Sequence, residues 1–221
     1  MTPFIKICGL KDEAAIAAAR DAGATHAGFM YFEKSPRHVS LDAMRALGPQ
    51  TGAMKRAAVL VNRGDDVIRE VVAALAPHLL QLHGDESPAR VAEIRALTGL
   101  PVMKVLSVST AADVDAAAAY GGADLIMFDA KAPKDADRPG GNGVTFDWAL
   151  LKALAPGAPW ILSGGLNEKT VADAIRQTGA GGVDVSSGVE DAPGQKSPAR
   201  IAAFTAAARA AYELPVLDIA S

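Results

Sequence analysis

The stretch Phe4–Leu10, with the sequence FIKICGL, holds the chain's one cysteine at the end of its first predicted strand. Side chains alternate along a strand, so Lys6 and Cys8 share one face and the two isoleucines share the other. We predict that the isoleucines pack outward against helices and that the polar pair points inward, as in a parallel barrel whose mouth carries a reaction site. Gly9 then allows a tight turn that leaves the sulfur open to a ligand. A lone cysteine is more often a small buried hydrophobe, and that alternative stays open here.

The composition indicates one domain and argues against a nucleic-acid or membrane partner. The chain has 221 residues, is 50% hydrophobic and carries a formal net charge of −3. It has no basic run and no stretch approaching the roughly 20 apolar residues that span a bilayer, so we expect no nucleic-acid and no membrane partner. One cysteine allows no internal disulfide, and the N-terminus lacks an apolar signal core. We therefore expect a cytoplasmic protein with a single domain over residues 1–221.

Short apolar runs alternate with stretches of helical period along the whole chain. We predict eight strands, at Phe4–Cys8, His26–Met30, Ala57–Val61, Leu79–Leu82, Val102–Val108, Leu125–Asp129, Trp160–Ser163 and Gly182–Ser186. Eight β/α units in about 220 residues predict an α/β fold of the (β/α)8 TIM-barrel type. The alternative is an open doubly wound sheet, which favours a glycine-rich phosphate turn after its first strand. Here the glycine-rich turns follow the last two strands.

The segments between the strands carry helix signals and two long connections. We expect helix N-caps at Asp65, Ser87, Thr110, Asn167 and Ser197. The connections Tyr31–Ser40 and Ala130–Val144 are longer than a strand-to-helix link needs. Both follow a strand, so we expect them at the face where barrels carry their chemistry, with ordinary surface insertions as the alternative.

The last two strands end in glycine-rich turns that suit a phosphate group. Glycine lets backbone N–H groups approach an anion, and barrels frequently build this site from the loops after strands 7 and 8. Glycines that only make turns are the alternative, and two such loops in the expected positions favour the site. The predicted phosphate-binding residues are Gly164, Gly165, Ser186, Ser187 and Gly188.

Three further side chains are candidates for substrate contact or catalysis. Arg37 follows Ser35-Pro36, where a stiffened guanidinium suits a planar carboxylate, although an isolated arginine is more often a solvated charge. Asp129 ends an apolar run, so we expect a poorly hydrated carboxyl group that favours the protonated form an acid catalyst needs; capping is the alternative. His83 directly follows the fourth predicted strand and either touches substrate or is a hydrogen-bonded structural histidine.

Seven motifs occur in an order that resembles one enzyme family. They are Lys6-Ile7-Cys8-Gly9-Leu10, Ser35-Pro36-Arg37, Gln81-Leu82-His83-Gly84-Asp85, Phe128-Asp129, Gly140-Gly141-Asn142-Gly143 with Phe146-Asp147-Trp148, Ser163-Gly164-Gly165-Leu166, and Asp184-Val185-Ser186-Ser187-Gly188-Val189-Glu190. In this order the chain resembles the phosphoribosylanthranilate isomerases of tryptophan biosynthesis. The resemblance runs from the first strand to the last helix.

The resemblance implies a substrate with a phosphate at one end and an aryl carboxylate at the other. In that family the residue matching Asp129 is the acid that opens the furanose ring, and the residue matching Cys8 is the base that removes the proton from the sugar C2. It also implies that no metal or organic cofactor is needed, and we leave a monomer or a homodimer open. The alternatives are the related histidine-pathway sugar isomerase, which uses two carboxylates, and a non-catalytic phosphosugar-binding barrel.

Overall fold

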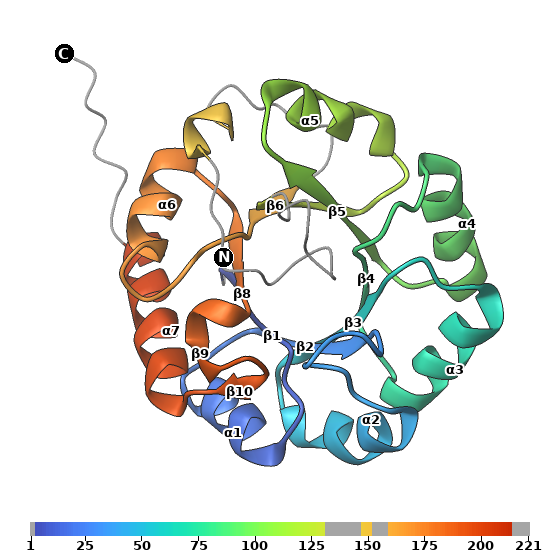
Figure 1. Cartoon of the computed structure of the whole chain (residues 1–221), viewed down its shortest axis with the longest axis horizontal. Helices are drawn as coiled ribbons and strands as arrows, with labels where there is room; N and C mark the ends of the chain where they lie inside the picture. Colours follow the sequence, from blue (N-terminus) through green and yellow to red (C-terminus); the bar gives the residue numbers. More distant parts are fainter. Residues whose placement is uncertain (1–2, 131–146, 152–158, 214–221) are drawn as a thin grey trace.

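The computed structural model describes residues 3–130, 147–151 and 159–213. Within these residues eight parallel strands close into a barrel that is surrounded by helices (Figure 1). The strands are β1 Phe4–Cys8, β2 His26–Tyr31, β3 Lys55–Leu60, β4 Leu79–Leu82, β5 Val102–Val108, β6 Leu125–Ala130, β7 Trp160–Leu162 and β8 Gly182–Val185. The predicted (β/α)8 barrel is confirmed, and each predicted strand lies within two residues of the observed bounds.

The strands follow one another around the barrel in chain order, and β8 closes the ring by pairing with β1. In that pair Phe4 lies opposite Gly182 and Lys6 lies opposite Asp184. A Cβ atom added at Gly182 would lie 2.5 Å from the Cβ of Phe4, so the closure needs a glycine there. The register brings the inward-facing polar residues of β1 and β8 to the same level of the barrel.

Helices cover the outside of the barrel along the described part of the chain. The α-helices are α1 Glu13–Asp21, α2 Leu41–Leu47, α3 Asp65–Leu75, α4 Pro88–Thr98, α5 Ala111–Asp115, α6 Val171–Thr178 and α7 Pro198–Glu213. Short 3-10 helices are η1 Gly48–Thr51, η2 Ala116–Tyr120, η3 Trp148–Leu151 and η4 Ser187–Val189. Beyond Ala130, the predicted connection 130–144 and the motif at 140–143 lie outside the described residues. No described helix has the length and apolar character needed to cross a membrane.

Three predicted helix starts are found where the sequence indicated. The side chain of Ser87 accepts a hydrogen bond from the backbone N–H of Arg90 at the start of α4. Thr110 forms a capping box with Asp113 before α5. Ser197 directly precedes α7, and its carbonyl accepts the backbone N–H of Ile201 at 2.9 Å.

Two predicted N-caps are wrong. The N-cap of α3 is Gly64, so Asp65 is the first residue of the helix, where its charge still suits the helix dipole. The N-cap of α6 is Thr170, because Asn167 is used in the turn before the helix. The side-chain oxygen of Asn167 accepts the backbone N–H groups of Lys169 and Thr170 there. Asn side chains stabilise turns as readily as helix starts, so the residue type alone does not separate the two.

The core has an outer layer between strands and helices and a small inner layer within the barrel. As predicted, Ile5 and Ile7 are fully buried in the outer layer. A separate cluster of apolar side chains contains Ala57, Leu79, Met103, Val105, Met127 and Ile161. Its members alternate with the outward residues of β3 to β7, which assigns them to the barrel interior. Lys6 also points inward, where its ammonium lies 2.7 Å from the carboxylate of Asp184.

A small hairpin after β8 was not predicted. Its strands are β9 Glu190–Ala192 and β10 Gln195–Lys196, and they pair antiparallel. The Pro193-Gly194 dipeptide between them is a turn signal in the sequence that could have found it. Figure 1 shows the hairpin outside the ring of barrel strands.

Candidate active site

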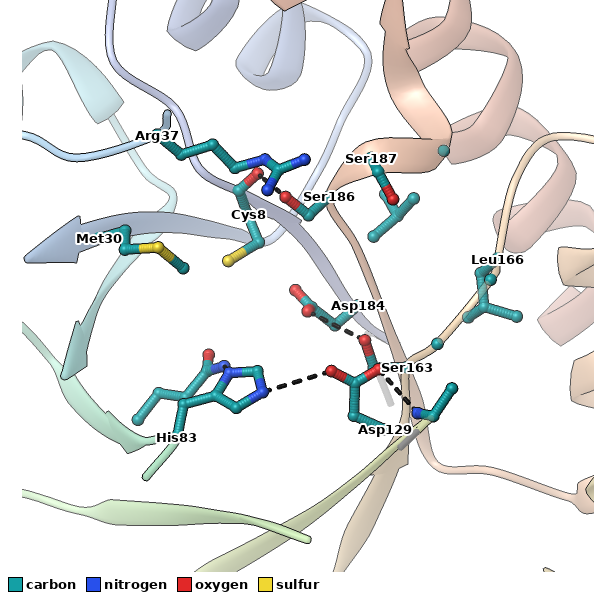
Figure 2. A pocket seen from close by; sticks show the side chains of 16 residues that line it. Cys8, Met30, Arg37, His83, Asp129, Ser163, Leu166, Asp184, Ser186 and Ser187 are labelled. Carbon is teal, nitrogen blue, oxygen red and sulfur yellow. Dashed lines mark hydrogen bonds and ion pairs between the residues drawn. The ribbon is translucent and has the colours of Figure 1, made fainter. Parts of the chain in front are cut away.

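A pocket opens at the carboxyl ends of the barrel strands, and it brings together every site residue that the sequence predicted. Cys8, Arg37, His83 and Asp129 line it. So do the predicted phosphate-binding residues Gly164, Gly165, Ser186, Ser187 and Gly188. Figure 2 shows the side chains of Cys8, His83 and Asp129 directed into this pocket. The roles of these residues stay predictions, but their meeting in one pocket agrees with the chemistry expected of them.

Cys8 is the last residue of β1 and is only 3% exposed. Burial raises the pKa of its thiol, the charge of Asp184 raises it further, and Lys6 opposes both effects. Lys6 precedes Cys8 by two residues on the inward face of β1 and lies opposite Asp184 of β8. The ion pair between Lys6 and Asp184 is therefore deeper in the barrel than the thiol. Burial alone would lower the pKa of Lys6, but Asp184 and Cys8 outweigh it and raise that pKa. The thiol therefore lies beside a lysine that keeps its positive charge.

Asp129 lies near the end of β6 and is 5% exposed. One carboxylate oxygen accepts the backbone N–H of Ala130 at 2.9 Å. The other lies 3.3 Å from Nε2 of His83, a distance that suits an ion pair, although the two atoms do not meet in hydrogen-bond geometry. A Cβ atom at Gly164 would lie 3.0 Å from the Asp129 carboxylate. The glycine after β7 therefore gives this carboxyl group its space.

His83 follows β4, and several hydrogen bonds fix its position. Its backbone N–H donates to the carbonyl of Leu60 at 2.8 Å, and its Nδ1 lies 3.3 Å from the side-chain nitrogen of Gln81. The turn after it is held by the buried carboxylate of Glu86, which accepts the backbone N–H of Gly84 at 3.0 Å. These contacts hold the imidazole ring in reach of both Asp129 and a ligand in the pocket.

Arg37 lies in the connection after β2 and is 2% exposed, so the alternative of a solvated surface charge is wrong. Its Nε and Nη2 atoms donate to the two carboxylate oxygens of Glu190, each at 2.7 Å. Its stem packs over Gly9, where a Cβ atom would lie 2.6 Å from Cδ of Arg37. The planar carboxylate that Arg37 binds in the structure is therefore that of Glu190. Contact between Arg37 and a ligand carboxylate stays a prediction.

The loops after β7 and β8 meet backbone to backbone. Gly164 and Gly165 have φ values of 88° and 66°, a region that favours glycine. A Cβ atom at Gly188 would lie 1.9 Å from the carbonyl oxygen of Leu166. The side chain of Ser186 donates to the carbonyl of Cys8 at 3.2 Å, which joins this wall to the end of β1. Side chains larger than hydrogen are excluded where the two loops touch.

Sequence reasoning missed Asp184, Ser163 and Gln81 as pocket residues. Ser163 donates to Asp184 at 3.4 Å, and Asp184 holds Lys6 behind the thiol. The sequence held a signal for Asp184, because Asp184 precedes Ser186 by two residues and so shares its face of the strand. Among the described residues, no group of three or more His, Cys, Asp or Glu side chains could hold a metal ion.

The fold and the pocket define a (β/α)8 barrel whose mouth combines a thiol, a carboxyl group and glycine-rich loops, the arrangement of a barrel enzyme. The family model for N-(5'phosphoribosyl)anthranilate (PRA) isomerase matches residues 5–207. The chain belongs to this family.

Relatives agree along nearly the whole chain. N-(5'-phosphoribosyl)anthranilate isomerase of Rhodopseudomonas palustris (strain HaA2) is 54% identical over 215 residues, which are 96% of this chain and 99% of the relative. The crystal structure of phosphoribosyl anthranilate isomerase from Thermotoga maritima has a TM-score of 0.85 at 31% identity, covering 95% of this chain and 100% of that one. A crystal structure of the isomerase with reduced 1-(o-carboxyphenylamino)-1-deoxyribulose 5-phosphate has a TM-score of 0.81 at 28% identity, with the same coverage.

Proposed function

We propose that this chain converts N-(5-phosphoribosyl)anthranilate into 1-(2-carboxyphenylamino)-1-deoxyribulose 5-phosphate, an Amadori rearrangement in tryptophan biosynthesis. The observation that carries the proposal is the meeting of Cys8, Asp129 and both glycine-rich loops in one pocket. Family membership supports it, as does the bound reduced product in a solved relative. We further propose that residues 1–221 act as one domain in the cytoplasm; sedimentation equilibrium distinguishes a monomer from a homodimer.

The reaction needs an acid and a base on different sides of the sugar. Asp129 donates a proton to the furanose ring oxygen, the bond from C1 to that oxygen breaks, and the nitrogen lone pair forms the iminium. Cys8, as the thiolate, then takes the proton from C2, which gives the enolamine. The enolamine becomes the ketone when C1 gains a proton and the C2 hydroxyl loses one. Strands β1 and β6 are three steps apart around a ring of eight, so their ends face each other across the mouth.

The remaining pocket residues hold the two ends of the substrate. Glycine-rich backbone at Gly165 and Gly188 suits the phosphate, which needs N–H groups more than bulky side chains. Arg37 suits the aryl carboxylate, since a guanidinium pairs with planar carboxylates. His83, 3.3 Å from Asp129, is near enough to touch the sugar and to stabilise the carboxylate after it has given up its proton.

Turnover is tested by following the loss of substrate fluorescence with the purified enzyme. Cys8→Ala is expected to lower kcat by roughly 10²–10⁴, the contribution of a general base, with little change in ligand affinity. Asp129→Asn is expected to stop ring opening while leaving phosphate binding intact. Wild-type protein that binds ligand without turning it over would show a non-catalytic phosphosugar-binding barrel instead.

The ring-opening role of Asp129 has a separate control. A substrate analogue already in the open-chain form bypasses the step that needs this acid. Asp129→Asn is therefore expected to be much slower than wild type on the cyclic substrate and close to wild type on the open-chain analogue. An equal loss of rate on both would assign the acid role to another residue.

A further inference from the structure

The β9–β10 hairpin contacts both walls of the pocket. A strand in a (β/α)8 barrel can lead directly into its helix, yet here residues 190–196 are inserted between β8 and α7. One wall carries Arg37 and the other carries the Ser186–Gly188 loop. The hairpin bonds to each of them through a different buried side chain.

Glu190, the first residue of the hairpin, fixes the guanidinium of Arg37. Its side chain is 4% exposed, and its two oxygens accept the Nε and Nη2 atoms of Arg37 in a bidentate pair. Burial would raise the pKa of Glu190, but Arg37 and Lys196 outweigh it and lower that pKa, so the carboxylate stays ionised. Such a pair fixes the orientation of a guanidinium as well as its position.

Lys196, the last residue of the hairpin, connects this pair to the Ser186–Gly188 loop. Its side chain is 1% exposed, and its ammonium donates to Glu190 at 2.7 Å and to the backbone carbonyl of Ser186 at 2.9 Å. One buried ammonium thus joins the carboxylate that holds Arg37 to the loop predicted to bind phosphate. A buried charge is costly unless well-placed hydrogen bonds satisfy it. Here one bond of the Lys196 ammonium goes to Glu190, which holds Arg37, and the other goes to the Ser186–Gly188 loop.

The turn of the hairpin packs tightly against the loop that carries Arg37. Gly194 has a φ of 76°, and a Cβ atom there would lie 2.5 Å from the carbonyl oxygen of Pro36. The backbone N–H of Gly194 donates to the Glu190 carboxylate at 3.2 Å. The hairpin is therefore in direct contact with the residue before Arg37 as well as with Arg37 itself.

We propose that Glu190 and Lys196 are positioning residues that fix the separation between Arg37 and the Ser186–Gly188 loop. They set the length of ligand that can bind both walls at once, a molecule with a carboxylate at one end and a phosphate at the other. This inference rests on the proposed function, in which the two walls hold the two ends of the substrate. Preformed spacing increases affinity for such a ligand because binding then orders less of the protein.

The test compares a ligand that has both ends with ligands that have one. Calorimetry measures the affinity of wild type and Lys196→Met for reduced 1-(o-carboxyphenylamino)-1-deoxyribulose 5-phosphate, inorganic phosphate and anthranilate. We expect the two-ended ligand to lose about tenfold or more and the single-ended ligands to stay within about twofold. For the substrate, KM should rise while kcat changes much less. Lys55→Met, at an exposed lysine that begins β3 at the other end of the barrel, should match wild type.

A second variant moves the hairpin without removing a charge. Gly194→Ala forces the turn away from Pro36 and should give the same pattern, which matters if Lys196→Met does not fold. An equal loss for single-ended and two-ended ligands, or unchanged affinity for all three in either folded variant, overturns the proposal. Wild type that binds the two-ended ligand but never turns over the substrate would overturn the proposed function and leave this test valid.

Discussion

Cys8 is surrounded by groups that act on its proton in opposite directions. Burial and the charge of Asp184 favour the thiol, whereas Lys6 and Lys196 favour the thiolate. Their sum raises the pKa of Cys8 above its usual 9.0, so the thiol form predominates at neutral pH. A base must lose this proton before it can take one from substrate. Lys6 is therefore the main group that brings Cys8 closer to its active form, and Lys196 has the smallest effect of the groups named.

The titration of Cys8 can be measured directly because the chain has one cysteine. Thiolate ultraviolet absorbance, with Cys8→Ser as the blank, should give a midpoint above 9.0. Lys6→Met removes a positive charge from beside the sulfur and leaves Asp184 unpaired, so its midpoint should be higher still. A midpoint below that of a free thiol, or one that Lys6→Met lowers, would contradict this account of the electrostatics.

Local pattern was enough to find the single residues but not their partners. Cys8 and Asp129 end apolar runs, and alternation along a strand directs both side chains inward. The contact between Arg37 and Glu190 could not be predicted from local pattern, because the two residues are 153 positions apart in the sequence. Only the closed barrel brings the connection after β2 beside the hairpin after β8.

At the level of elements, the strands were easier to predict than their connections. Each strand is a short apolar run whose burial on both faces leaves a clear signal. The turn at Asn167 and the hairpin at Glu190–Lys196 are held by side chains bonding to backbone or to distant residues, which periodicity does not record. These connections nevertheless determine the pocket, since the ends of the strands alone do not form its walls.

The glycine after β7 offers a test of how one connection controls the acid. At Gly164 a Cβ atom would lie 2.5 Å from the backbone nitrogen of Ala130 and 3.0 Å from Asp129, at a φ of 88°. Gly164→Ala should therefore displace the carboxyl group and lower kcat/KM about tenfold or more. Stability should also fall, by about 1 kcal/mol from the backbone alone.

The matched control for that variant is Gly99→Ala. Gly99 ends α4 with a φ of 67°, and nothing lies within 4 Å of its added Cβ atom. It should lose a similar amount of stability, measured by urea unfolding, while keeping wild-type kcat/KM. If both variants lose activity alike, strain in the backbone is responsible and the contact with Asp129 is not.

For the whole molecule, the barrel separates a polar mouth from an opposite end where two rings stack. At that end the ring of Phe4 stacks on His26 with centroids 3.8 Å apart, and Thr25 contacts Nδ1 of the histidine at 2.9 Å. Burial, then Lys6, Lys55 and His78, lower the pKa of His26 to about 3. Folding therefore keeps this ring neutral over a pH range in which the unfolded chain would protonate it.

This difference predicts how the stability of the barrel depends on pH. An unfolded histidine binds its proton near pH 6.5, and folded His26 does so only near 3, so the unfolded state gains protons first as the pH falls. The free energy of unfolding should drop by roughly 1.5 kcal/mol between pH 6.5 and about 5, above the range in which most carboxylates titrate. Urea unfolding at several pH values measures this. In His26→Gln most of that drop should be lost, whereas His78→Gln, at an exposed residue whose pKa is also lowered, should keep most of it. A His26→Gln protein with the wild-type pH dependence would show that other groups destabilise the barrel in acid.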